Sequence, residues 1–90
     1  MWFEWDWAKA KRNVAEHGVS FDEALTAFSD PLSLTVFDPD HSLEEDRFVL
    51  QGVSSLGRLL VVVHTDRGEA IRIISARLAT RRERKSYANL

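Results

Sequence analysis

The first third of the chain carries apolar residues at helical spacing between short breaks. Trp7, Ala10 and Val14 share one stripe of residues 7–17, while the charged residues between them face elsewhere. Asp6 stands where a helix N-cap is expected, and a glycine follows the segment at the position that commonly ends a helix. The pattern therefore predicts a helix over residues 7–17.

A second helix and a short strand complete this part of the chain. Ser20 and Glu23 have the spacing of a capping box. The apolar residues after the cap follow at i, i+3, i+4 and i+7, namely Phe21, Ala24, Leu25 and Phe28. The helix ends at Asp30-Pro31, because the residue before a proline disfavours helical geometry. The aromatic-rich residues 2–5 are typical of a short strand.

From residue 32 the spacing becomes that of strands. Four β-prone runs, separated by turn-rich segments, cover residues 32–37, 47–53, 58–65 and 70–76. The last three runs are joined by short loops, which predict an antiparallel meander. The run 58–65 is apolar on both faces through Val63, as expected for the centre of a sheet.

The chain closes with a second capping-box signature, Thr80-Arg81-Arg82-Glu83, which predicts a last helix toward Tyr87. This helix is polar on nearly every side, so it is marginal alone and a partner could order it. The elements together predict one α+β domain over residues 1–90. Its parts are a short N-terminal strand, two helices, an antiparallel β-meander and a C-terminal helix.

The composition limits the class of protein and the cellular compartment to be expected for this domain. Hydrophobic residues make up 44% and charged residues 29% of the chain, as in folded globular proteins. The absence of cysteine excludes a disulfide framework and a thiolate metal site. The longest apolar run, Leu59–Val63, is far shorter than a membrane span, and residues 1–6 do not resemble a signal peptide. We therefore expect a cytoplasmic protein without membrane association.

The net charge of −2 conceals an asymmetry between the two halves of the chain. Residues 1–45 hold three Lys/Arg and ten Asp/Glu, whereas residues 46–90 hold nine Lys/Arg and four Asp/Glu. Eight of those nine basic residues are arginines. The asymmetry predicts an anion-binding surface built from the second half, unless the two halves neutralise each other across the fold.

Several segments together resemble the BrnT family over nearly the whole chain. The matching residues include Phe3-Glu4-Trp5-Asp6, His17-Gly18-Val19-Ser20-Phe21, Arg72-Ile73-Ile74-Ser75-Ala76-Arg77, Glu83 and Tyr87. The resemblance implies a RelE-like fold and a ribonuclease toxin of a bacterial type II toxin–antitoxin system. It also implies a BrnA-like antitoxin partner with a toxin-binding part and a DNA-binding part. The toxin would then reach operator DNA only through the antitoxin, in a complex that represses its own operon.

A metal-independent endoribonuclease needs a base for the ribose 2′-OH, cations for the phosphorane and an acid for the leaving 5′-oxygen. RelE-like toxins place basic, acidic and aromatic side chains on the sheet and the C-terminal segment. The resemblance and this chemistry together indicate five catalytic candidates: Arg72, Arg77, Glu83, Tyr87 and His64. The RNA-binding candidates are Arg47, Arg58 and Arg67. No cofactor and no metal ion are expected.

Most of these candidates also have a structural interpretation. Arg72 and Arg77 suit phosphate binding, but on a straight strand they face opposite sides of the sheet. A site that uses both therefore needs a bulge, or a turn near Ser75. Glu83 also completes a capping box, and His64 can be a packed histidine at the end of an apolar strand.

The remaining polar residues give weaker signals. The three histidines are too far apart in sequence for a zinc motif, and His17 and His41 are the weaker candidates among them. The acidic residues of segment 38–46 are interpreted as a solvated loop.

The alternative to a ribonuclease is a catalytically weak or inactive module that binds a partner and acts as co-repressor. A stand-alone DNA-binding regulator fits least, because the helix pair in the first half is acidic.

Overall fold

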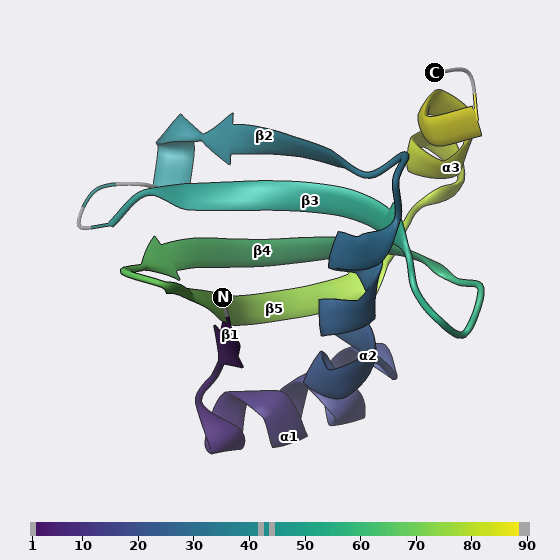
Figure 1. Cartoon of the computed structure of the whole chain (residues 1–90). Coiled ribbons are helices and arrows are strands. Elements are labelled where there is room, and N and C mark those ends of the chain that lie inside the picture. The colour runs from purple at the N-terminus through teal and green to yellow at the C-terminus, as the bar shows by residue number, and fades with distance from the viewer. Residues whose placement is uncertain (1, 42, 44, 89–90) are drawn as a thin grey trace.

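A five-stranded sheet organises the chain in the computed structural model, which describes residues 2–41, 43 and 45–88 (Figure 1). Its strands are β1 (Trp2–Glu4), β2 (Leu34–Asp38), β3 (Arg47–Val53), β4 (Leu59–Arg67) and β5 (Ala70–Leu78). The helices are α1 (Trp7–His17), α2 (Phe21–Thr26) and α3 (Arg81–Ala88), with short 3-10 turns η1 (Ala27–Ser29) and η2 (Pro39–His41). This content and order confirm the predicted α+β class.

The strand order is β1-β5-β4-β3-β2. Strands β2 to β5 pair antiparallel with their sequence neighbours, which confirms the meander and the central position of β4. Strand β1 pairs parallel with β5, and its described residues lie opposite residues 70–72. Strand β2 is shifted from the predicted run 32–37, because Asp30 accepts a hydrogen bond from Leu32 N (2.9 Å) and holds a turn there.

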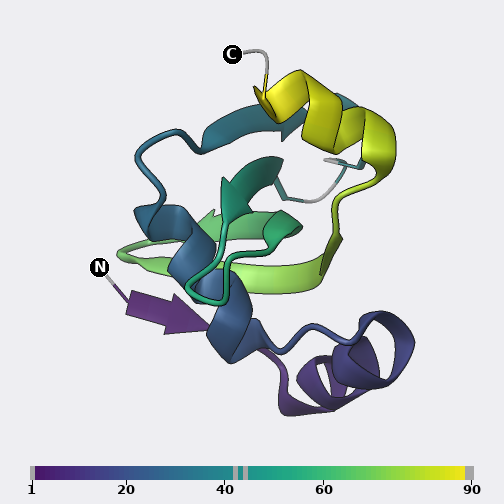
Figure 2. The ribbon, with the colours of Figure 1, turned by 90° about the vertical axis from the view of Figure 1, so that its right-hand side faces the viewer.

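One face of the sheet is covered by α2 and η1, and α1 lies along β5 (Figures 1 and 2). The buried core lies between that face and the helical segment. Its members are Val19, Phe21, Ala24, Ala27, Leu50, Leu60, Val62, Ile73 and Ala76. The second predicted helix therefore buries the apolar face expected of it, although its last turn is 3-10 rather than α.

The capping predictions for α1 are correct. Asp6 Oδ1 accepts a hydrogen bond from Lys9 N (3.0 Å), and Gly18 takes the left-handed conformation with φ of 68°. Of the predicted apolar stripe, Ala10 packs against the core, whereas Trp7 is 79% exposed and Val14 is half exposed. The buried residue of this helix is Asn13.

Asn13 explains why α1 packs with a polar side chain inward. Its Nδ2 donates to Val19 O (2.9 Å) and Ala76 O (2.7 Å), and its Oδ1 accepts from Ala76 N (3.1 Å). Strand β1 is too short to pair with this part of β5. The Asn13 amide therefore satisfies the outward backbone groups of β5 in place of a neighbouring strand.

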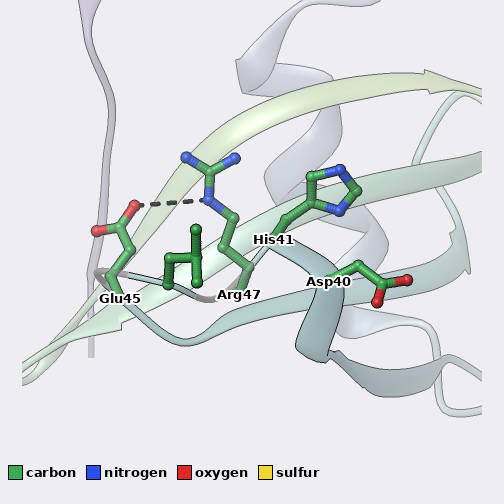
Figure 3. Close-up of a pocket in the computed structure, with 5 residues that line it drawn as sticks. Asp40, His41, Glu45 and Arg47 are labelled. Carbon is green, nitrogen blue, oxygen red and sulfur yellow. Dashed lines mark ion pairs between the residues drawn. The ribbon is translucent and has the colours of Figure 1, made fainter.

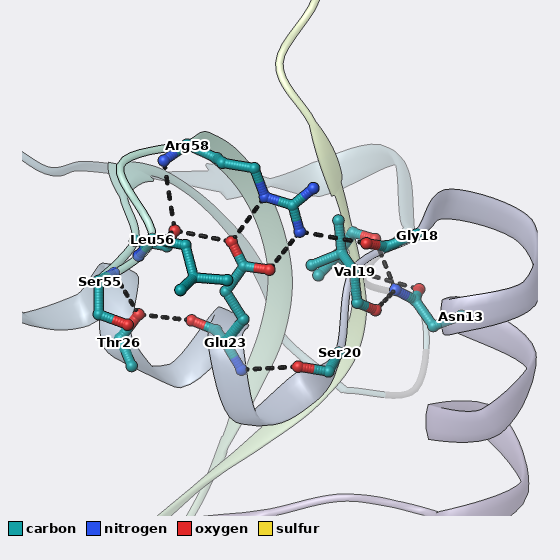
Figure 4. A network of polar contacts seen from close by, with 11 residues as sticks. Asn13, Gly18, Val19, Ser20, Glu23, Thr26, Ser55, Leu56 and Arg58 are labelled. Carbon is teal, nitrogen blue, oxygen red and sulfur yellow. Dashed lines mark hydrogen bonds and ion pairs between the residues drawn. The ribbon is translucent and has the colours of Figure 1, made fainter.

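An ion pair between buried Glu23 of α2 and partly exposed Arg58 joins the helices to the β3–β4 turn (Figure 4). Ser20 Oγ caps Glu23 N (3.0 Å) as predicted, but the Glu23 carboxylate turns to Arg58 and Ser54 instead of returning to the cap. Arg58 Nε donates to Glu23 Oε2 (2.9 Å), and Arg58 Nη2 donates to Gly18 O (3.1 Å). Arg58 is the main cause of the lowered pKa of Glu23.

Helix α3 begins with the capping box that its sequence predicts. Thr80 Oγ1 accepts from Glu83 N (3.2 Å), and Glu83 Oε1 accepts from Thr80 N (2.8 Å). No residue of α3 is buried, in agreement with its polar sequence. Within the described residues, no helix has the length and apolar character required to cross a membrane.

We expect Asn13→Ala to lower the free energy of unfolding by about 2–3 kcal/mol, because three buried backbone groups lose their partner. For a domain of this size, that corresponds to a fall in Tm on the order of 10 °C or more. Thermal and urea unfolding followed by circular dichroism measure the change. Lys11→Ala, at an exposed position of the same helix, is the control. Equal stability of the two variants would contradict the role of Asn13.

Candidate active site

An irregularity in β5 determines which side chains share a face. Val63 of β4 lies opposite Ser75, but the next residue, His64, lies opposite Ile73. Ile74 is therefore an extra residue, a β-bulge that reverses the alternation of side chains along β5. As a result, Arg72 and Arg77 lie on the same face of the sheet. This is the geometry that a site using both residues requires.

The face opposite α2, here called the arginine face, carries Arg47, Arg72 and Arg77. Arg47 and Arg72 flank Thr65 in one row across β3, β4 and β5. From strand spacing, the Cα atoms of Arg47 and Arg72 are about 10 Å apart. Arg77 lies opposite Val61, about 13 Å farther along the sheet. The three arginines thus span a surface the size of a short stretch of nucleic acid rather than a single phosphate.

Arg72 in this row and Arg67, two residues beyond Thr65 on β4, share one weak acidic partner, Glu4. Arg72 Nη1 is 3.9 Å from Glu4 Oε1, and Arg67 Nε is 3.6 Å from the same oxygen. Arg47 Nε is 3.7 Å from Glu45 Oε1, and Asp38 lies opposite Arg47 on β2. Long, partly exposed ion pairs contribute little stability, so a phosphate can compete for the guanidinium groups of Arg67 and Arg72.

Arg77 is held more firmly than the other arginines of this face. Its Nη1 and Nη2 donate to the two carboxylate oxygens of Glu83 at 2.7 and 3.0 Å. The Arg77 hydrogen bond is the main reason that the pKa of Glu83 falls to about 2. A carboxylate with so low a pKa is a weak base at neutral pH. In this geometry, Glu83 orients Arg77 and caps α3.

Tyr87 is also committed to a contact within the protein. Its Oη donates to Asp30 Oδ2 (2.5 Å), an oxygen that also accepts from Val53 N (2.8 Å). This hydrogen bond to Asp30 raises the pKa of the Tyr87 hydroxyl. Tyr87 thus anchors the C-terminal part of α3 to the start of the β-meander.

Two of the predicted site residues lie away from the arginine face. His64 is buried on the helix-covered face between the rings of Phe28 and Phe48, with centroid distances of 4.9 and 5.8 Å. Burial lowers its pKa, and neither ring nitrogen has a hydrogen-bond partner among the described residues. Arg58 is bound to Glu23 on the helix side. Neither side chain therefore lies with the arginines of that face.

A pocket of about 550 Å³ opens beside Arg47 (Figure 3). Its lining residues are Asp40, His41, Leu43, Glu45 and Arg47, and we call it the Arg47 pocket. This segment was predicted from the sequence to be a solvated acidic loop, with His41 among the weaker candidates. In the structure, His41 and part of the segment line a pocket. The available signal was the i, i+3 spacing of Asp38 and His41, because His41 Nδ1 lies 2.8 Å from Asp38 Oδ2.

The described residues contain no group of three His, Asp or Glu side chains placed to hold a metal ion. The polar groups of the Arg47 pocket are an imidazole, carboxylates and a guanidinium. These are the groups of acid–base chemistry at a phosphate.

Comparison with known proteins shows which family this chain and its fold resemble. A family model described as "Ribonuclease toxin, BrnT, of type II toxin-antitoxin system" matches residues 5–83. The structure is similar to a crystal structure of the Brucella abortus ribonuclease toxin BrnT, with a TM-score of 0.66 and 25% sequence identity. The similarity covers 90% of this chain and 99% of that one. No curated protein sequence matches the chain.

The class defined by these findings is that of ribonuclease toxins from type II toxin–antitoxin systems, which act with an antitoxin partner. Within this class, the chain belongs to the BrnT family.

The Arg77–Glu83 pair makes stability depend on pH in a defined range. Because the pKa of Glu83 is about 2 in the folded protein and 4.5 without its partners, the pair contributes fully above about pH 4.5 and is lost toward pH 2. We expect Glu83→Gln to be less stable than the wild type at pH 7, by about 2 kcal/mol. Urea unfolding at pH 7 and pH 2.5 should show this difference shrinking at the lower pH. A difference that stays constant would contradict the assignment.

Proposed function

We propose that this chain is a metal-independent endoribonuclease that inhibits translation and growth by cleaving RNA on the arginine face. The observation that carries the proposal is the bulge at Ile74, which puts Arg72 on the same face as Arg77 and Arg47. Guanidinium groups bind phosphate oxygens through paired hydrogen bonds and stabilise the charge of a phosphorane. Membership of a ribonuclease toxin family supports the same reaction.

The second candidate function is a module that binds its partner and acts as co-repressor with little or no cleavage. It is favoured by one observation: Glu83 and Tyr87, two of the predicted catalytic residues, are engaged in contacts that hold α3. In that case the arginine face would serve the partner alone. Purified protein that leaves RNA intact would support this function and contradict the first.

Arg72→Ala should abolish growth arrest and reduce RNA cleavage by about 10²-fold or more, because the lost guanidinium stabilises transition-state charge. Its 3.9 Å ion pair with Glu4 is weak, so folding should be preserved. Arg77→Lys keeps the charge but loses paired hydrogen bonding, and should also be impaired. Cleavage of a labelled RNA in EDTA and thermal unfolding are measured together. Lys11→Ala is the control, and full activity of Arg72→Ala would contradict the proposal.

We further propose that a BrnA-like antitoxin neutralises the toxin in the cytoplasm by covering the arginine face. An acidic or amphipathic segment laid there would neutralise the arginines and exclude RNA in one step. The DNA-binding part of such an antitoxin would bring the complex to operator DNA, so that the pair represses its own operon.

Hydrogen exchange of the free toxin and of the antitoxin complex tests this placement. Peptides that contain Arg47 and Arg72 should gain protection in the complex, and RNA cleavage should stop at equimolar antitoxin. Protection confined to α1 and α2 would contradict the proposed interface.

A further inference from the structure

The catalytic residues predicted from the sequence supply no acid or base on the arginine face. Glu83 forms an ion pair with Arg77, and Tyr87 donates a hydrogen bond to Asp30. His64 is buried on the helix-covered face of the sheet. The arginine face therefore provides positive charge for the phosphate. The groups that accept and donate protons must come from residues next to this face. The Arg47 pocket adjoins this face, because Arg47 belongs to both.

The Arg47 pocket holds a carboxylate and an imidazole around one guanidinium. Figure 3 shows Glu45 and His41 on opposite sides of Arg47, while the Asp40 carboxylate points away from it. Glu45 Oε1 approaches the guanidinium at Nε, 3.7 Å away. A volume of about 550 Å³ is within the range of small-molecule binding sites.

His41 is oriented by a second residue. Asp38 Oδ2 lies 2.8 Å from His41 Nδ1, and Asp38 Oδ1 accepts from Asp40 N (3.2 Å), which fixes the turn. With Nδ1–H donated to Asp38, the other ring nitrogen, Nε2, is the one that can exchange a proton with a ligand. The imidazole is 69% exposed, so RNA can reach it.

We propose that Glu45, Arg47 and His41 form the reaction centre of the ribonuclease activity proposed above, with Glu45 as general base and His41 as general acid. The assignment rests on that proposed function. The Glu45 carboxylate offers oxygens that can accept a proton, and His41, with Nδ1 held by Asp38, offers Nε2 as the ring nitrogen that can donate one. Their positions on opposite sides of Arg47 suit an in-line displacement, in which the entering and leaving oxygens lie on opposite sides of phosphorus.

The reaction balances without a further reactant. Glu45 takes the proton of the ribose 2′-OH, and the 2′-oxygen forms a bond to phosphorus. The bond from phosphorus to the 5′-oxygen breaks, and His41 Nε2–H protonates that oxygen. The products are a 2′,3′-cyclic phosphate and a 5′-hydroxyl, with Glu45 protonated and His41 neutral. Solvent then exchanges one proton with each side chain.

The row of the arginine face extends this centre. Thr65 lies between Arg47 and Arg72 in the register, so an RNA strand with its scissile phosphate at Arg47 can place a neighbouring phosphate near Arg72. The sheet therefore links the proposed reaction centre to the phosphate-binding arginines.

The test uses the full chain and a short RNA with one cleavage site. His41→Ala and Glu45→Gln should each slow single-turnover cleavage by about 10²- to 10⁴-fold. Both should bind a 2′-deoxy version of that RNA as tightly as the wild type, whereas Arg47→Ala should bind it more weakly. The matched controls are His17→Ala and Glu16→Gln at the end of α1, which should cleave at the wild-type rate.

A substrate with sulfur in place of the bridging 5′-oxygen separates the two roles. A thiolate leaves without protonation, so this substrate should restore most of the rate of His41→Ala. It should not rescue Glu45→Gln, which still lacks the base. Rescue of Glu45→Gln rather than His41→Ala would overturn the assignment of roles.

The remaining outcomes separate this inference from the proposed function. If wild-type protein cleaves RNA and both variants cleave at the same rate, the inference is wrong and the proposed function stands. If the wild-type protein cleaves no RNA under any of these conditions, the proposed function fails, and the assigned reaction centre fails with it.

Discussion

The extra residue in β5 is the constraint on which the arginine face depends. Without Ile74, the alternation of a regular strand would turn Arg72 and Arg77 to opposite faces. The bulge lies two residues before Ala76, whose backbone N–H and C=O are both held by the Asn13 amide. Asn13 thus fixes the part of β5 that follows the bulge, and with it the face on which Arg77 lies. The packing of Asn13 of α1 against β5 therefore helps to determine which arginines lie together on the opposite face of the sheet.

Helix α3 is attached by polar contacts rather than by a buried apolar face. Its first turn is joined to β5 through Arg77 and Glu83, and its last turn to the β-meander through Tyr87 and Asp30. Such partly exposed polar contacts contribute less stability than a buried apolar face. The side chains that hold α3 are therefore better placed to position Arg77 than to transfer protons.

Local sequence signals predicted most of the fold. The caps at Asp6 and Thr80 and the apolar centre of β4 depend on neighbouring residues and are found as expected. The parallel pairing of β1 with β5 depends on residues nearly 70 positions apart, so no local pattern contains it. The exposure of Trp7 and Val14 in α1 has the same origin, because the hydrogen bonds of Asn13 to a distant strand help to set which side of the helix packs.

The candidate site was less predictable, because residue type does not reveal the face on which a side chain lies. His64 has suitable chemistry but lies under the helices, whereas His41 lies in a pocket because Asp38 orients it. The central claim is that RNA binds across the arginine face. A crystal structure with a non-cleavable 2′-O-methyl RNA tests it most directly. The account predicts successive phosphates at Arg47 and Arg72, and RNA bound over α1 or α2 instead would contradict it.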